Sequence, residues 1–313
     1  MINKSLLAYL ILLLLGGPAA LAGDILPPPR QISPHVWAWI GPLGPPSRDN
    51  GGYRMNLGFI VGSRGIVVVD TGYTPAMARA MLAHIRRVSD LPILFAVNTN
   101  SQPHRFMGNT VFKQAGAVLV AHPLERARMD RLSGQYLAAI ERILALETDS
   151  LALPALPERL VSEGLDIDLG EVSVRVRHHG PAHTPAPLVV HVPQDGVVFA
   201  GDILYSGRLL AVLRDSSVRG WIRTFRALRE YGSATFIPGH GEPGPLTAFE
   251  FPTLSYLQAL HTHMTRMVDE GIDVQDAIAG MDQRAWAHLA NYAQLAGRNA
   301  SWAYLEAEAA SFE

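Results

Sequence analysis

Short apolar runs alternate with helical patterns along the first two thirds of the chain, which predicts mixed α and β structure. Residues 57–61 and 65–70 are expected to form two strands joined at a Ser-Arg-Gly turn. The second carries the run I-V-V-V-D, which is β-branched and continuous and therefore typical of a strand buried on both faces. A helix is expected next, because Thr74 is a suitable N-cap and Pro75 suits the first helical position. Its apolar face is predicted at Met77, Met81, Ile85 and Val88.

The same patterns continue beyond this helix. Further strands are predicted at residues 36–40, 92–97 and 117–121, within 160–176, at 189–192 paired with 197–200, and at 235–237. Further helices are predicted at 106–115, at 123–146, along the face that carries Trp221, Ile222, Phe225 and Leu228, and from 254 onward. Residues 25–30 are proline-rich and predict an extended linker, and the Gly/Pro loop 41–52 is long enough to form a flap beside a pocket. This order fits an α/β fold with two mixed sheets and outer helices, a four-layer αββα sandwich with extra C-terminal helices.

Composition narrows the class of protein. The 313 residues are 48% hydrophobic and 17% charged, which is typical of a globular chain. The formal net charge is −2 and no Lys/Arg run occurs, so nothing indicates a nucleic-acid partner. The absence of cysteine excludes disulfides, thiolate nucleophiles and zinc-thiolate sites.

The N-terminus has the pattern of a signal peptide. Lys4 supplies the positive charge, residues 6–15 are apolar, and Ala20-Leu21-Ala22 is a small-x-small cleavage signal. We therefore expect residues 1–22 to be removed, leaving a periplasmic or secreted protein that starts near Gly23. The apolar run is too short for a comfortable transmembrane span, so no stable membrane anchor is expected after cleavage, and an uncleaved anchor is the alternative. The rest divides into an N-terminal linker and first strand (23–52), a main domain (53–247) and a helical extension (248–313).

Polar residues gather in loops that follow predicted strands. The first loop, at residues 98–109, reads N-T-N-S-Q-P-H-R-F-M-G-N. The second, at 178–185, reads H-H-G-P-A-H-T-P, and a third region pairs F-A-G-D at 199–202 with I-P-G-H-G at 237–241. Each of these loops lies at the C-terminal end of a predicted strand, and together they hold the polar residues that could carry chemistry.

Four of these segments, taken in order, resemble the metallo-β-lactamase superfamily. The segments are V-V-D-T-G at 68–72, A-H-T-P at 182–185, F-A-G-D at 199–202 and P-G-H-G at 238–241, and the likeness spans about residues 56–240. The resemblance implies an αββα sandwich and zinc-dependent hydrolysis of a small-molecule substrate. The export signal and the segment L-P-E-R-L-V at 156–161 are similar to the SoxH-like, or quinoprotein relay system, branch, which implies a periplasmic quinoprotein or cytochrome partner.

The loop at 98–109 departs from the family pattern N-T-H-x-H-x-D-H-x-x-G-N. Its framing residues match, namely Asn98, Thr99, Gly108 and Asn109. Asn100 and Gln102 stand where two zinc histidines belong, His104 where the aspartate belongs, and Arg105 where the last histidine belongs. Neutral amides are poor zinc ligands, so the family's first zinc position keeps one good ligand, His183, and should be empty or weak.

The family's second zinc position is better preserved. His104, Asp202 and His240 would supply three protein ligands, and a water would complete the usual four. The expected cofactor is therefore one Zn²⁺ held by His104, Asp202 and His240, with His183 nearby. Asp202 is the candidate catalytic residue, because it could orient the attacking water. Arg105 cannot ligate a metal.

These residues leave different functions open. One hypothesis is an exported, mononuclear metal-dependent hydrolase of an ester, thioester or amide. The alternative is a catalytically inactive binding or accessory protein with a lost metal site, in which Arg105 contacts an anionic ligand. A true β-lactamase is disfavoured, because the metal loop is altered and C-terminal helices are added. Asp70 is expected to fix the loops by hydrogen bonds rather than to bind metal.

Overall fold

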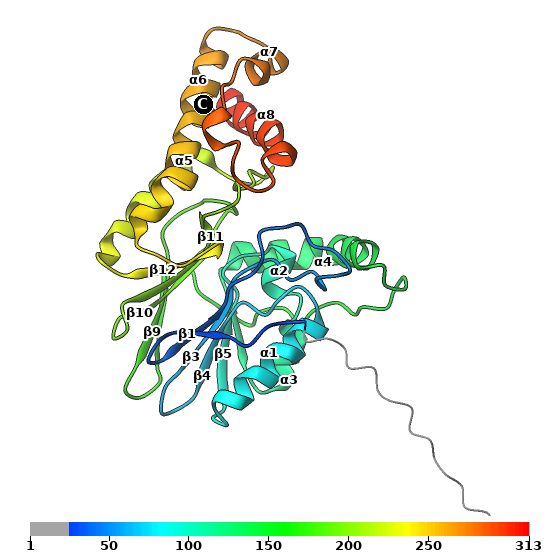
Figure 1. Ribbon diagram of the computed structural model, residues 1–313, viewed down its shortest axis with the longest axis vertical. Coiled ribbons are helices and arrows are strands. Elements are labelled where there is room, and N and C mark those ends of the chain that lie inside the picture. The colour runs from blue at the N-terminus through cyan, green and yellow to red at the C-terminus, as the bar shows by residue number, and fades with distance from the viewer. Residues whose placement is uncertain (1–24, 313) are drawn as a thin grey trace, which may run out of the picture.

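Two β-sheets lie face to face in the middle of the protein, and helices cover the outer face of each sheet (Figure 1). The computed structural model describes residues 25–312, so the predicted signal peptide lies outside the described residues. The larger sheet has the order β1-β2-β3-β4-β5-β6-β7, and the smaller has the order β12-β11-β10-β9-β8. This arrangement is an αββα sandwich with added C-terminal helices, and the predicted fold class is confirmed.

The elements have the following bounds. The strands are β1 (Arg30–Ser33), β2 (Val36–Trp39), β3 (Leu57–Val61), β4 (Ile66–Val69), β5 (Ile93–Val97), β6 (Val118–Ala121), β7 (Arg159–Leu160), β8 (Gly164–Asp168), β9 (Ser173–His178), β10 (Leu188–Val192), β11 (Val197–Tyr205) and β12 (Thr235–His240). The α-helices are α1 (Pro75–Val88), α2 (Pro103–Phe106), α3 (Asn109–Gln114), α4 (Pro123–Leu144), α5 (Val218–Ala227), α6 (Tyr256–Asp269), α7 (Val274–Ala279) and α8 (Tyr292–Ala310). Short helical segments of other types are η1 (Leu228–Tyr231), η2 (Leu246–Phe249), η3 (Glu250–Ser255) and η4 (Arg284–Trp286).

Strand β4 illustrates why the central strands are apolar throughout. Val67 and Val69 face the cluster between the two sheets, whereas Ile66 and Val68 face the cluster beneath the outer helices. The strand is thus buried on both faces, as its sequence predicts. The helix after it begins as predicted, because the side chain of Thr74 accepts a hydrogen bond from a backbone N–H of the first turn.

The segment that carries the metal loop differs from its prediction. In place of one helix at 106–115, the chain forms α2 and α3, separated at Met107 and Gly108. The break follows from close packing: a methyl group on Gly108 would lie 2.1 Å from the carbonyl oxygen of Thr71. As a result His104 and Arg105 occupy one helical turn rather than an irregular loop.

Strands β11 and β12 extend farther than their patterns predict. Beyond residues 200 and 237, the two strands remain paired in parallel, with Tyr205 opposite His240. Register irregularities between Phe199 and Tyr205 accommodate the turn-like Gly-Asp sequence within the strand. Asp202 and His240 therefore sit on adjacent strands of the same sheet rather than on separate loops.

The start of the described chain is packed rather than free. Leu26, in the segment predicted as an extended linker, is fully buried, and the carbonyl of Pro27 accepts a hydrogen bond from the indole of Trp39 at 2.9 Å. The short strand β1 follows, pairs with β2, and was not predicted.

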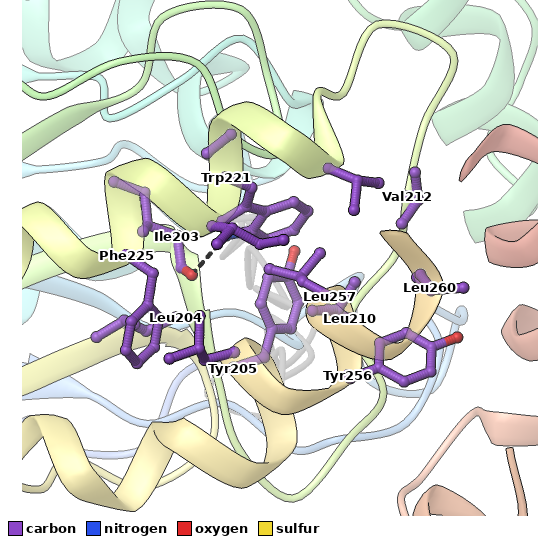
Figure 2. Packing of buried hydrophobic residues seen from close by; sticks show 14 of the residues in the cluster. Ile203, Leu204, Tyr205, Leu210, Val212, Trp221, Phe225, Tyr256, Leu257 and Leu260 are labelled. Atoms are coloured by element: carbon purple, nitrogen blue, oxygen red, sulfur yellow. Dashed lines mark hydrogen bonds between the residues drawn. The ribbon is translucent and has the colours of Figure 1, made fainter. Parts of the chain in front are cut away.

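The C-terminal helices are fixed to the smaller sheet through one large apolar cluster. Figure 2 shows Trp221 of α5 and Leu257 of α6 packed around Tyr205, with the Trp221 indole donating to the carbonyl of Ile203 at 2.8 Å. Asn299 of α8 adds hydrogen bonds to the backbone of the segment after β11. Within residues 25–312, no helix is long and apolar enough to span a membrane.

Candidate functional site

The guanidinium of Arg105 lies at the centre of the site and is 1% exposed. Its Nε and Nη2 donate to the two carboxylate oxygens of Asp202, at 3.0 and 2.6 Å. Nη1 donates to Asp70 at 3.0 Å and to the carbonyl of Asn56 at 2.8 Å, and Nη2 also donates to the carbonyl of Gly239 at 3.0 Å. A guanidinium has five N–H donors, so every donor is used. The expectation that Arg105 contacts an external anion is therefore wrong.

Asp70 has the structural role expected of it. It ends β4 with a φ of 61°, in the left-handed region that aspartate tolerates better than most residues. Its carboxylate accepts from the backbone N–H of Thr99 at 2.7 Å, from the Thr99 hydroxyl and from Arg105. Burial raises the pKa of Asp70 to about 6, while Arg105 and Thr99 oppose that rise. These bonds hold the start of the metal loop against β4.

Asp202 is fully buried, and neighbouring donors occupy several of its acceptor positions. Its Oδ2 accepts from Arg105 and, at 2.8 Å, from the amide of Asn100, whereas Oδ1 accepts from Arg105. Burial alone would raise the pKa of Asp202, but the Arg105 guanidinium and the neighbouring histidines hold it well below its usual range. A carboxylate offers about four acceptor positions, so Oδ1 retains one free acceptor position. The close fit requires glycine at 239, where a methyl group would lie 2.3 Å from Oδ1.

Two histidines lie next to this carboxylate, one at each oxygen. The Nε2 of His104 lies 3.3 Å from Oδ2 of Asp202, and the Nε2 of His240 lies 3.4 Å from Oδ1. The Nδ1 of His240 is 2.7 Å from the carbonyl oxygen of Arg54, so Nδ1 carries the proton and Nε2 presents a lone pair to the site. The Nε2 of His104 is buried and has no hydrogen-bond partner.

Burial keeps both imidazoles neutral. It lowers the pKa of His104 to about 4 and that of His240 to about 3, and the charge of Arg105 adds to the effect at both residues. Neutral imidazole is the form that ligates metal. The site therefore presents two neutral imidazoles and one carboxylate at neutral pH.

The donor set fits one divalent metal ion. One ligand atom from each of His104, Asp202 and His240 lies within 4.8 Å of the others. Zinc bonds of 2.0–2.2 Å in a tetrahedral arrangement place neighbouring ligand atoms roughly 3.4 Å apart. The Nε2 of each histidine lies at about that spacing from one oxygen of Asp202, His104 from Oδ2 and His240 from Oδ1.

The other candidate ligands are arranged differently. His183 lines the same cavity, but its Nδ1 contacts the carbonyl oxygen of Ala211 at 2.8 Å and its nitrogens are not part of the three-residue group. Gln102 also lines the cavity, whereas Asn100 is turned toward Asp202. The structure thus brings together the second-position ligands predicted from the sequence and leaves His183 beside them.

Comparison with known proteins shows which family the chain resembles. The sequence profile of the "Metallo-beta-lactamase superfamily" matches residues 50–240. This chain belongs to the metallo-β-lactamase superfamily. The matched region ends at His240, so α6, α7 and α8 lie beyond it.

Individual superfamily members are distant in sequence. Metallo-beta-lactamase IND-1 of Chryseobacterium indologenes is 22% identical over 246 residues, covering 77% of this chain and 92% of that protein. The linear primary-alkylsulfatase of a Pseudomonas strain is 22% identical over 263 residues, covering 73% of this chain, and the chain spans about half of that enzyme, 49%.

Solved structures show the same superfamily fold. A metallo-beta-lactamase from Pontibacter korlensis gives a TM-score of 0.59 at 20% identity, covering 74% of this chain and 98% of that one. The DIM-1 metallo-beta-lactamase gives a TM-score of 0.57 at 17% identity, with the same coverage of both chains. At these identities the likeness establishes the fold alone.

The sequence analysis missed several residues that line the cavity above the metal ligands. They are Arg54, Tyr73, Tyr205, Arg208, Leu213, Leu295 and Arg298. The Gly/Pro loop 41–52, predicted to form a flap beside a pocket, contributes Pro46. Arg208 follows the F-A-G-D motif by a few residues, which is a local signal, but Arg298 reaches the cavity only because α8 folds back over it.

Replacing Arg105 by methionine should lower the free energy of unfolding by about 3–5 kcal/mol, because it leaves two buried carboxylates without their counter-charge. Chemical denaturation of metal-free protein measures the change. The matched control is Arg64→Met, which removes an exposed ion pair to Asp168 and should cost under about 1 kcal/mol. Equal costs for the two variants would contradict the central role of Arg105.

The buried neutral histidines predict a pH dependence. In the unfolded chain His240 titrates near 6.5, whereas in the folded protein its pKa is about 3, so the unfolded state binds more protons between these values. Stability from this residue is therefore present above about pH 6.5 and lost as pH falls toward 3. The raised pKa of Asp70 acts in the opposite direction below pH 6, so the parent must be compared with a variant.

The variant His240→Asn should lose less stability than the parent when metal-free protein is moved from pH 7 to pH 4. Urea unfolding at several pH values gives the two curves, and their difference isolates His240 from Asp70. Parallel curves would mean that His240 is not held neutral in the folded protein.

Proposed function

We propose that this protein is a hydrolase that uses one divalent metal ion, most simply Zn²⁺, on a small-molecule ester, thioester or amide. The observation that carries the proposal is the converging set of His104, Asp202 and His240, in which both imidazoles are neutral and the Nε2 of His104 has no hydrogen-bond partner. A metal bound there would polarise the substrate carbonyl or ester and supply hydroxide near neutral pH. Three protein ligands with an open fourth position is the usual arrangement of catalytic zinc sites.

The side chains divide the remaining tasks. Asp202 stays ionised because its pKa is held low, and the acceptor position left on its Oδ1 would bind the metal ion. Arg105 holds Asp202 in place through two parallel bonds and does not reach the cavity itself. Tyr205 stacks on His240 with ring centroids 5.2 Å apart and fixes the plane of that imidazole. The cavity above holds about 230 Å³, roughly seven or eight waters, which suits a small substrate or the head of a longer one.

A second candidate function is a metal-free binding protein in the same cavity. The observation that favours it is the state of Asp202, whose Oδ2 already accepts two N–H donors and whose charge is balanced by Arg105. A carboxylate in this state attracts a metal ion less than an unpaired one does. In that case the cavity would bind its ligand without hydrolysing it.

We also propose export and an association with a periplasmic quinoprotein or cytochrome system. The pattern of residues 1–22 supports export, and the segment at 156–161 supports the SoxH-like branch. The relatives above are named as an alkylsulfatase and a metallo-beta-lactamase. Because these names point to different substrates, we propose the substrate no more narrowly than a small ester, thioester or amide.

Purified protein reloaded with zinc should contain about one equivalent of metal, and His104→Ala should contain less than about a tenth, because two ligands no longer suffice. Metal analysis after removal of free zinc measures both. His288→Ala is the matched control, since this exposed histidine lies outside the cavity and its loss should leave the metal content unchanged.

Hydrolysis of a generic ester distinguishes the two candidate functions. The hydrolase requires that activity follow metal content across the parent, His104→Ala and His288→Ala. If the parent bound no zinc or iron after reloading and still bound small ligands in the cavity, the metal-free candidate would replace it.

Export is tested by the N-terminus of the product. When the full chain is produced in a Gram-negative host, the periplasmic fraction should hold protein that begins near Gly23. Intact-mass measurement decides the cleavage position. Uncleaved protein in the membrane fraction would instead support an N-terminal anchor.

A further inference from the structure

The cavity above the metal ligands contains more positive charge than its surroundings balance. Arg54, Arg208 and Arg298 all line it, and among the described residues that line it there is no aspartate or glutamate. The carboxylates of Asp202 and Asp70 are already bonded to Arg105. With the histidines neutral, two carboxylates and Arg105 leave one negative charge facing three guanidinium groups.

Arg208 is the most constrained of these arginines. Its side chain is 4% exposed and lies over the ring of Tyr205 at 6.0 Å from the centroid. Its Nε is buried without a hydrogen-bond partner. Its Nη1 is 3.4 Å from the Nδ1 of His240, but that nitrogen donates its proton to the carbonyl of Arg54 and cannot accept another. The guanidinium therefore has buried N–H groups that need an acceptor.

The other two cavity arginines also have donor groups or charge without a partner among the described residues. The Nε of Arg54 is also buried without a partner, although its backbone carbonyl is used by His240. Arg298 lies on α8, is exposed, and makes no salt bridge in the part of the chain that the structure describes. Buried N–H groups without an acceptor are costly and rare in native proteins. Their presence on two arginines of one cavity indicates a ligand that supplies the acceptor atoms.

We propose that Arg54, Arg208 and Arg298 bind an oxyanion group of the substrate: a sulfate, a phosphate or a carboxylate. Guanidinium groups match the geometry of these anions and bind them by paired hydrogen bonds. Naming the substrate of the hydrolase as an anionic small molecule rests on the function proposed above, whereas the anion site itself needs no metal.

The cavity also has an apolar side. Pro46, Leu213 and Leu295 line it together with the arginines. An anionic group with a short hydrocarbon portion would therefore fit better than a bare ion. Since Leu295 and Arg298 belong to α8, the C-terminal extension completes the site and lies outside the region matched by the superfamily profile.

Isothermal titration calorimetry with inorganic sulfate, inorganic phosphate, acetate and hexyl sulfate tests the proposal. Chelator-treated and zinc-loaded protein are each titrated at low ionic strength, because salt screens such contacts. Metal-free protein should bind at least one of these probes at one site per chain. The preferred probe distinguishes a sulfate, phosphate or carboxylate substrate, and tighter binding of hexyl sulfate than of sulfate would show the contribution of the apolar side.

Two variants and a control assign the binding to these arginines. Arg298→Met, at an exposed position that does not threaten folding, should raise the dissociation constant by roughly tenfold, and Arg208→Met by more, since charge-assisted hydrogen bonds contribute about 1.5–3 kcal/mol. Arg64→Met, at an exposed ion pair away from the cavity, should leave the constant unchanged.

The outcomes separate this proposal from the proposed function. Binding that persists without zinc and is weakened by Arg298→Met supports the anion site even if the metal site fails. Binding that requires zinc and is unaffected by both arginine variants would place the anion on the metal and overturn the proposal. The absence of binding by any probe, with or without zinc, would also overturn it.

Discussion

The buried guanidinium of Arg105 is the interaction on which the rest of the site depends. Asn56 precedes β3 and Asp70 follows β4 of the larger sheet, whereas Asp202 and Gly239 belong to β11 and β12 of the smaller one. One side chain thus joins the two sheets at the edge where their functional residues meet. Because all five donors are used and two carboxylates are engaged, its removal would leave buried charges without partners.

The same guanidinium determines what the neighbouring groups can do. It keeps Asp202 ionised despite complete burial, and it adds to the desolvation that keeps His104 and His240 neutral. A carboxylate beside two neutral imidazoles is a suitable donor set for a metal ion. The same guanidinium reduces the negative charge at Asp202. A metal ion can therefore use only the acceptor position that is left on one carboxylate oxygen. In the family pattern that the sequence resembles, the position of Arg105 carries a histidine ligand, whereas here it carries a buried structural charge.

The fold was predicted well from the sequence because the signals for its helices and strands lie within short segments. Strand β4 is apolar at every position, α1 has an N-cap and a first-turn proline, and the four family segments occur in order. The sequence predicted His104, Asp202 and His240 as partners because their positions relative to the framing residues are fixed. It did not predict the break at Gly108, which results from contact with a segment far away in the chain. The role of Arg105 was also missed, since a charged residue in a polar loop gives no sign that it will be buried.

The grouping of the cavity arginines was even harder to predict from the sequence. Arg54 lies before β3, Arg208 after β11 and Arg298 on α8, so no spacing rule connects them. What brings them together is the apolar cluster that residues of α6 and α8 share with Tyr205 and Trp221, which places the C-terminal extension beside the end of β11 (Figure 1). Tyr205 links the apolar cluster to the metal ligands. Its ring contacts Trp221 within the cluster and also stacks on His240. The helices outside the superfamily region therefore act on the site in two ways, by supporting the imidazole and by supplying positive charge to the cavity above it.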